Sequence, residues 1–190
     1  MQQALRIIRY LKHAPSYGIL YKSNTSLKIQ TFSDSNWATC ATTRRSVFGY
    51  CIFLGTSLVA WKSKKQTTVS RSSSEAESRA LASLACELQW IQYLLQNLYF
   101  SVSTSYTAFC DNNSAIHIAK NPTFHERTKH TEIDCHIIRQ KLVVGLIHLL
   151  HVPSTRQLAY MFTKLLHPST FQVATSKLGL YNLHAHLERG

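Results

Sequence analysis

Three carboxylates stand where they could act together on one substrate. Asp34 and Asp111 each follow a β-rich stretch, and Glu77 lies in the opening turns of a long helical pattern. The carboxyl ends of parallel strands meet at one edge of a sheet, and a helix that begins there would add Glu77. Three neighbouring carboxylates repel one another unless a cation joins them. Mg²⁺ prefers oxygen ligands, and two such ions about 4 Å apart can activate water against a phosphodiester. The alternative is that each acid is an unrelated turn or capping residue.

The charge balance indicates a polyanionic partner. The 190 residues include 21 Lys and Arg against 9 Asp and Glu, a net charge of +12. A domain this basic favours nucleic acid over a membrane surface, and a basic surface around an acidic pocket is typical of a nuclease. No apolar run approaches the about 18–20 residues that span a bilayer, and no signal peptide is recognisable. We therefore expect no membrane partner and an intracellular location, cytoplasmic or nuclear.

The longest helical pattern, Ser72 to Leu98, positions Glu77. Its apolar residues recur at steps of three and four: Leu81, Leu84, Leu88, Ile91 and Leu95. Ser72 and Glu75 have the spacing of a capping box, which leaves Glu77 without a structural role. Ser74 and Glu77 have the same spacing, so the opposite register stays open at this point.

The remaining patterns predict a mixed α/β layer fold with helices on a central sheet. We expect strands at residues 17–21, 27–32, 47–54, 58–61, 106–110 and 146–152. We expect further helices at residues 4–11, 114–119, 130–144 and 156–166, followed by a tail. The five cysteines are odd in number, scattered and without a CxxC pair, so neither a zinc ribbon nor a disulfide framework is indicated.

Several motifs carry a family resemblance that covers most of the chain from residue 27 onward. They read TFSDSNWA, RRSVFGY, VAWKSKKQTTVSRSSSEAESRALA, FCDNNSAIHIAKNPTFHERTKHTEIDCHIIRQKL and HVPSTRQLAYMFTK. With these motifs in this order, the chain resembles the ribonuclease H domain at the C-terminal end of copia-type retrotransposon Pol polyproteins.

The resemblance implies a fold, an activity and a domain organisation. The fold would be ribonuclease H-like, a five-stranded mixed sheet with its first three strands antiparallel, flanked by helices. The activity would be two-metal hydrolysis of the RNA strand in RNA–DNA hybrids, with Mg²⁺ or alternatively Mn²⁺. Its catalytic and metal-binding acids transfer onto Asp34, Glu77 and Asp111. Residues 1–26 would be the tail of an upstream reverse transcriptase region, itself a partner, residues 27–167 the domain, and residues 168–190 a C-terminal tail.

One position departs from the family pattern. The motif ADxFTK of the family reads AYMFTK here, so Tyr160 stands where the fourth acid is expected. A neutral phenol supplies no carboxylate to a second metal ion, and we expect impaired activity. The alternatives are a non-catalytic nucleic-acid-binding remnant, and an inert fragment that folds poorly away from its reverse transcriptase.

A basic link before the long helix is expected to contact phosphates along a hybrid rather than to form a solvated turn. Its residues are Lys62, Lys64, Lys65 and Arg71. Asn112 is a candidate contact to the 2′-hydroxyl of RNA, although capping of the next helix is the preferred interpretation.

Other polar and aromatic residues receive structural interpretations. His125, His130, Cys135 and His136 match no familiar zinc spacing. We expect Asp134 to pair with His130 on a helix surface, with a replacement fourth acid as the alternative. We expect Trp37, Trp61 and Trp90 in the core, and His117 as a packed or surface residue rather than a general base.

Overall fold

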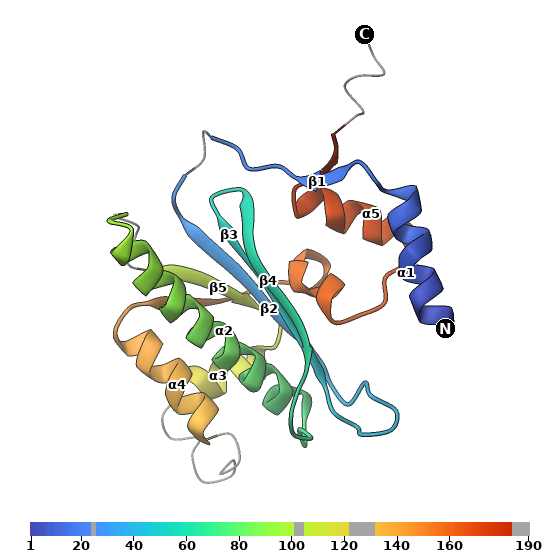
Figure 1. The fold of residues 1–190 in the computed structure, drawn as a ribbon. Helices are drawn as coiled ribbons and strands as arrows, with labels where there is room; N and C mark the ends of the chain where they lie inside the picture. Colours follow the sequence, from blue (N-terminus) through green and yellow to red (C-terminus); the bar gives the residue numbers. More distant parts are fainter. Residues whose placement is uncertain (24–25, 101–104, 122–131, 184–190) are drawn as a thin grey trace.

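A five-stranded mixed sheet forms the centre of the molecule (Figure 1). The computed structural model describes residues 1–23, 26–100, 105–121 and 132–183. The strands, in spatial order, are β4 (Ser57–Lys65), β3 (Val47–Leu54), β2 (Ile29–Asn36), β5 (Tyr106–Cys110) and β6 (Ile147–His151). Strands β2, β3 and β4 pair antiparallel, whereas β5 pairs parallel with both β2 and β6. The predicted fold class, including the antiparallel first three strands, is confirmed.

Three helices cover one face of this sheet (Figure 1). They are α2 (Ser73–Asn97), α3 (Asn113–Lys120) and α4 (Glu132–Val143). The predicted apolar stripe of α2 is buried except at Leu95, which is partly buried, and it packs with sheet residues such as Tyr50, Ile52 and Leu149 in the main core. The long crossover through α2 is what allows β5 to return parallel to β2. The apolar residues of α4 are only partly buried, because Ile133 and Val143 are exposed.

The opposite face carries a second, smaller core. It contains Cys51, Phe53 and Leu58 from the sheet and Leu178 from the C-terminal region. Two 3-10 segments, η3 (Ser154–Arg156) and η4 (Leu158–Phe162), precede the helix α5 (Pro168–Lys177). The predicted α-helix over residues 156–166 is therefore wrong, and the regular helix starts later, at Pro168.

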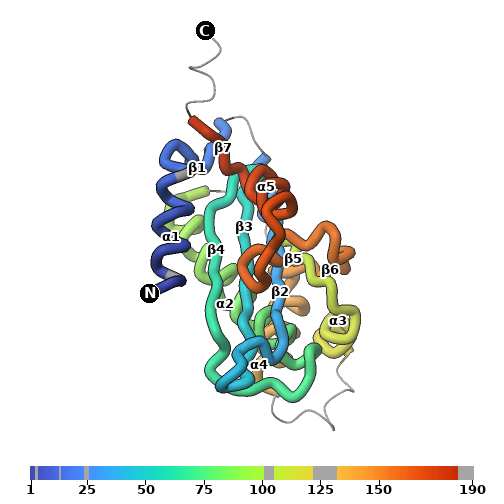
Figure 2. Tube along the Cα trace, turned by 90° about the vertical axis from the view of Figure 1, so that its right-hand side faces the viewer, coloured from blue at the N-terminus to red at the C-terminus, as the bar shows by residue number. Residues whose placement is uncertain are grey.

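The two ends of the described chain lie against each other (Figure 2). The N-terminal helix α1 (Gln2–His13) leads into β1 (Tyr17–Ile19), which pairs antiparallel with β7 (Leu180–Asn182). The rings of Tyr10 and Phe171 meet edge to face, with centroids 5.8 Å apart. The segment from residue 168, expected as a tail, thus contains a helix and a strand, while the domain boundaries stay predictions.

Two strands run further than the sequence pattern predicts. Strand β2 continues past Phe32 to Asn36, so Asp34 lies within the strand rather than at its end. Strand β4 extends to Lys65, which places the three predicted phosphate-binding lysines on a strand rather than in a link.

The three tryptophans, expected in the core, are instead about half exposed. Trp37, Trp61 and Trp90 are 48%, 51% and 58% exposed. Across the described residues, none of the helices combines the length and apolar character that crossing a bilayer requires.

Candidate active site

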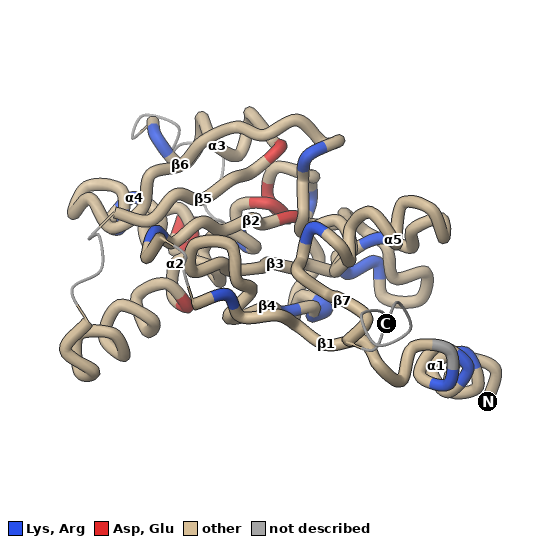
Figure 3. Tube along the Cα trace, turned by 90° about the horizontal axis from the view of Figure 1, so that it is seen from above, with Lys and Arg blue, Asp and Glu red and all other residues tan. Residues whose placement is uncertain are grey.

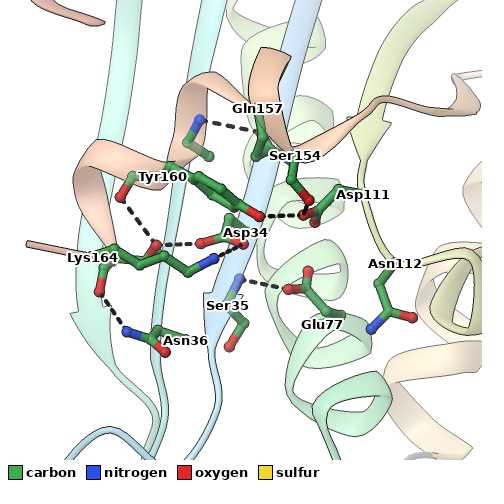
Figure 4. A network of polar contacts seen from close by, with 12 residues as sticks. Asp34, Ser35, Asn36, Glu77, Asp111, Asn112, Ser154, Gln157, Tyr160 and Lys164 are labelled. Carbon is green, nitrogen blue, oxygen red and sulfur yellow. Dashed lines mark hydrogen bonds and ion pairs between the residues drawn. The ribbon is translucent and has the colours of Figure 1, made fainter. Parts of the chain in front are cut away.

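Asp34 and Asp111 lie side by side because their strands are parallel neighbours. The register pairs Gln30 with Thr107 and Phe32 with Phe109. Two further residues along each strand bring Asp34 level with Asp111, which directly follows β5. Asp34 is buried, with 1% of its surface exposed, and Asp111 is partly exposed. The predicted parallel pairing therefore brings these two carboxylates together (Figure 4).

Glu77 reaches the same place from the first turns of α2. Ser72 caps the helix by accepting the Glu75 N–H at 3.1 Å, and Glu75 in turn accepts the Arg71 N–H at 2.8 Å. Glu75 therefore serves the helix start, which decides the register left open by the sequence. The Ser35 N–H of β2 donates to Glu77 Oε1 at 2.8 Å, and the Glu77 side chain points toward Asp34 and Asp111.

Tyr160 makes direct contact with the acidic cluster. Its hydroxyl donates to Asp111 Oδ2 at 2.7 Å, and the Ser154 hydroxyl donates to the same oxygen at 2.8 Å. Burial raises the pKa of the Tyr160 phenol, and the hydrogen bond to Asp111 acts in the same direction. The phenol is therefore held neutral as a donor, where a carboxylate in its place would be an acceptor.

Two residues just after η4 engage Asp34. The Thr163 hydroxyl donates to Asp34 Oδ2, and the Lys164 ammonium lies 3.6 Å from Asp34 Oδ1. The same ammonium lies 3.4 Å from the centroid of the Tyr160 ring, a cation–π contact. Segment 154–164 thus places donors and a positive charge over the carboxylates (Figure 4).

The electrostatics of the cluster disfavour full ionisation. Burial raises the pKa of Asp34, and the charge of Asp111 adds to this, while Thr163 and Lys164 lower it. Burial also raises the pKa of Glu77 well above its ordinary value, with the charge of Asp34 as the next cause. A positive partner among these oxygens would relieve both penalties.

The donor set fits a hard divalent cation in part. Ligand atoms of Glu77, Cys110 and Asp111 all lie within 4.8 Å of one another. Burial raises the pKa of the Cys110 thiol well above its ordinary value, so the carboxylate oxygens are the suitable ligands.

The chain itself already occupies most of these carboxylate oxygens. Five of the six have a donor or cation of the chain beside them: both of Asp34, both of Glu77 and Oδ2 of Asp111. The Cys110 thiol provides the second contact of Glu77, at 3.8 Å. An ion entering this site would therefore compete with internal partners, most strongly at Asp34.

The predicted phosphate-binding lysines lie around a different pocket. Lys62, Lys64 and Lys65 line it together with Arg79 from α2. Asp134 also lines this pocket, and its charge interactions are with Arg79 and Glu75. The alternative in which Asp134 replaces the fourth acid at the cluster is therefore not supported.

The other predicted site residues have local structural roles. Asn112 caps α3 by accepting the Ala115 N–H at 2.9 Å, which agrees with the preferred interpretation. Arg71 lies exposed in the link before α2, and its backbone N–H serves the helix start. His117 is a surface residue of α3. His125 and His130 lie outside the described residues, so the zinc spacing is not tested there.

Sequence reasoning missed Ser154, Thr163 and Lys164. One signal was present: Lys164 stands four residues after Tyr160, a spacing that joins side chains on one helical face. No local pattern indicates that this face turns toward β2.

Comparison with known proteins agrees with this geometry, although no family model matches the chain. The chain is 39% identical over 180 residues to the retrovirus-related Pol polyprotein from transposon RE1 of Arabidopsis thaliana, covering 95% of the chain and 12% of the polyprotein. It is 27% identical over 176 residues to the corresponding polyprotein from transposon TNT 1-94 of Nicotiana tabacum, covering 93% and 13%. The chain thus spans about an eighth of the length of these relatives.

Solved structures with the same fold are ribonuclease H proteins. LC11-RNase H1, isolated from compost by a metagenomic approach, has a TM-score of 0.51 at 15% identity, over 72% of this chain and 93% of that one. The N-terminal RNase H domain of Rv2228c from Mycobacterium tuberculosis has a TM-score of 0.50 at 13% identity, over 80% and 98%. These likenesses define the fold as that of a ribonuclease H-like domain.

The sequence relatives add to this likeness. Over 92–95% of its length the chain is similar to copia-type retrotransposon Pol polyproteins, and its fold is that of a ribonuclease H-like domain.

Proposed function

We propose that this chain is a ribonuclease H-type endonuclease domain that hydrolyses the RNA strand of RNA–DNA hybrids, with activity impaired by Tyr160. The observation that carries the proposal is the meeting of Asp34 from β2, Asp111 from the end of β5 and Glu77 from the first turns of α2. Buried carboxylates with raised pKa values are unfavourable for stability alone, and such groups cluster at functional sites. The parent reverse transcriptase region is the proposed covalent partner.

The three acids have distinct proposed roles. The carboxylates of Asp34, Glu77 and Asp111 would together hold the cations, with Glu77 and Asp111 as the pair whose ligand atoms lie within 4.8 Å of each other. Bound Mg²⁺, or alternatively Mn²⁺, would supply an activated water and stabilise the leaving oxygen of the RNA phosphodiester. The Ser35 N–H would fix the orientation of Glu77 throughout.

The substrate would be held by positive charge outside the acidic cluster. Lys62, Lys64, Lys65 and Arg71 are the proposed phosphate contacts, and Asn112 is a further candidate beside Glu77. Phosphate contacts carry little sequence information, so we expect binding to hybrids of many sequences. The net charge of +12 supports this preference for a polyanion.

A second function, hybrid binding without cleavage, is favoured because side chains of the protein itself already contact the carboxylate oxygens. Tyr160, Thr163 and Lys164 already satisfy oxygens that a working two-metal site would leave for ions. A chain with this arrangement could bind hybrids without cleaving them, as a remnant of a retroelement.

Cleavage of a labelled RNA–DNA hybrid separates the two functions. The assay compares wild type, Asp111→Asn and Tyr160→Asp in Mg²⁺ and in Mn²⁺. We expect low wild-type activity, loss in Asp111→Asn and a gain in Tyr160→Asp, because an acid at that position restores a ligand. Equal activity of Tyr160→Asp and wild type would contradict the role given to Tyr160. Absence of cleavage by all three, with binding that weakens steeply as salt rises, would favour the non-catalytic alternative.

A further inference from the structure

The ammonium of a lysine of this chain lies beside Asp34, the most buried carboxylate of the acidic cluster. The Lys164 ammonium lies 3.6 Å from Asp34 Oδ1, and its side chain is 33% exposed against 2% for that of Asp34. The positive charge of Lys164 lowers the pKa values of both Asp34 and Glu77. Its electrostatic effect is thus of the same sign as that of a bound metal ion.

The backbone holds this lysine in place from several sides. The Lys164 N–H donates to the Tyr160 carbonyl at 2.9 Å, and the Asn36 side chain donates to the Thr163 carbonyl at 3.3 Å. From β4, the Ser63 hydroxyl donates to the Phe162 carbonyl. The segment that carries Lys164 is therefore anchored to both β2 and β4.

The ring of Tyr160 forms the other wall around the ammonium. The 3.4 Å approach to the ring centroid is close enough for a favourable cation–π interaction, and the same tyrosine donates to Asp111. Tyr160 therefore acts as a positioning residue for Lys164, in addition to filling the place of an acid.

We propose that Lys164 is a built-in cation of the acidic pocket, which neutralises Asp34 in the ion-free protein and competes there with divalent ions. The inference rests on the proposed function, because it takes the pocket to be an ion site. Two positive charges at one carboxylate repel each other, so ion binding requires the ammonium to move away or to tolerate that repulsion. Its partial exposure gives the side chain a route into solvent.

The test measures Mn²⁺ binding to the full chain by electron paramagnetic resonance of the free ion, without substrate. It compares wild type with Lys164→Met, Lys164→Arg and Lys28→Met. Lys28 is an exposed residue just before β2, so its substitution controls for the loss of one positive charge. We expect Lys164→Met to bind Mn²⁺ at least about tenfold more tightly than wild type, which corresponds to the loss of one close charge repulsion. Lys164→Arg and Lys28→Met should bind like wild type.

Thermal unfolding supplies a second readout. In EDTA, Lys164→Met should unfold at a lower temperature than wild type, because Asp34 loses its counter-ion, and Mn²⁺ should raise its midpoint more than that of wild type. If Lys164→Met fails to fold, Lys164→Gln serves the same comparison.

The outcomes separate the inference from the proposed function. If wild type and Lys164→Met bind Mn²⁺ equally tightly, and Asp34→Asn does not bind it, the role of Lys164 is overturned. The ion pocket itself would then still be supported. Mn²⁺ binding that is unaffected by Asp34→Asn, or undetectable in every variant, would overturn both.

Discussion

Glu77 makes the folded protein sensitive to pH. Burial first, and the charge of Asp34 next, raise its pKa well above the ordinary value of 4.5. The folded state therefore binds this proton more tightly than the unfolded state, and the free energy of unfolding falls as pH rises from about 4.5 through the folded pKa. Glu77→Gln removes this loss, and its amide oxygen can still accept the Ser35 N–H. In EDTA at pH 8 we expect the variant to melt above wild type, by about 2–4 °C for each kcal/mol gained.

The comparison at pH 4 is the internal control for this prediction. There Glu77 is protonated in the folded state and mostly protonated in the unfolded state, so the two proteins should melt at more similar temperatures than at pH 8. Glu132→Gln, at an exposed acid in the first turn of α4, should not melt above wild type at pH 8. A Glu77→Gln variant that melts below wild type at pH 8 would mean that the ionised carboxylate stabilises the ion-free fold.

At the residue scale, the sequence was sufficient to predict that the three acids lie close together. It was insufficient to predict which side chains contact them. The proximity of Asp34, Glu77 and Asp111 could be predicted because strands and a helix start are local patterns, although β2 runs two residues past Asp34. Lys164 and Thr163 meet Asp34 across more than 120 residues of chain. Their approach depends on how η4 lies on the sheet, which no local pattern describes.

Among the elements, η4 lies unusually close to the sheet at Gly49. A Cβ added to Gly49 would stand 2.5 Å from Phe162 Cβ and 3.1 Å from the Lys62 carbonyl oxygen. Neither neighbour is the far end of a flexible side chain, so Gly49→Ala should push η4 outward. We expect a loss of about 1–3 kcal/mol in the free energy of unfolding, measured by chemical denaturation. The segment carrying Lys164 would move with η4, so Mn²⁺ affinity should change as well.

Gly18→Ala is the matched control for this substitution. Gly18 also lies in a strand, but the nearest atoms to its added Cβ belong to the Leu183 side chain, the closest at 3.1 Å, which can rotate away. A loss of stability at Gly18→Ala as large as at Gly49→Ala would show that the close contact with η4 is not the cause.

Hydrogen bonds between this segment and the sheet explain why the α-helix predicted over residues 156–166 does not form. Gln157 is buried, where its side chain donates to the Ser33 carbonyl and accepts the Ala159 N–H. The carbonyls of Phe162 and Thr163 accept from Ser63 and Asn36 of the sheet. These tertiary hydrogen bonds satisfy backbone groups that an α-helix would satisfy internally. The 3-10 geometry follows from the sheet beneath it rather than from residue spacing.

At the scale of the whole molecule, the α/β layer fold was predictable and the distribution of exposed aromatic and basic residues was not. Periodicity and the long crossover were enough for a central sheet with helices on it, and the family resemblance supplied the five strands with the first three antiparallel. The exposure of Trp61 follows from the position of β4 at the sheet edge, where its outer face is only partly covered. Charge is also divided: three acids lie together where β2, β5 and α2 meet, whereas the lysines of β4 line a separate pocket, and further basic residues occur on elements such as α1 (Figure 3).

This division of charge predicts that hybrid affinity and ion binding can be changed separately. Lys62 and Lys64 face the α2 side of β4 and line a pocket with Arg79, apart from the acidic cluster. If each lysine contacts one phosphate, Lys62→Ala and Lys64→Ala should each make the fall of log affinity with log salt shallower by about 0.7–0.9. Both variants should leave Mn²⁺ affinity unchanged. Fluorescence anisotropy of a labelled RNA–DNA hybrid at several salt concentrations measures the slope, with Lys28→Ala as the control. Slopes equal to wild type in both variants would remove this pocket from the hybrid-binding surface, because a lysine that releases no counter-ion touches no phosphate.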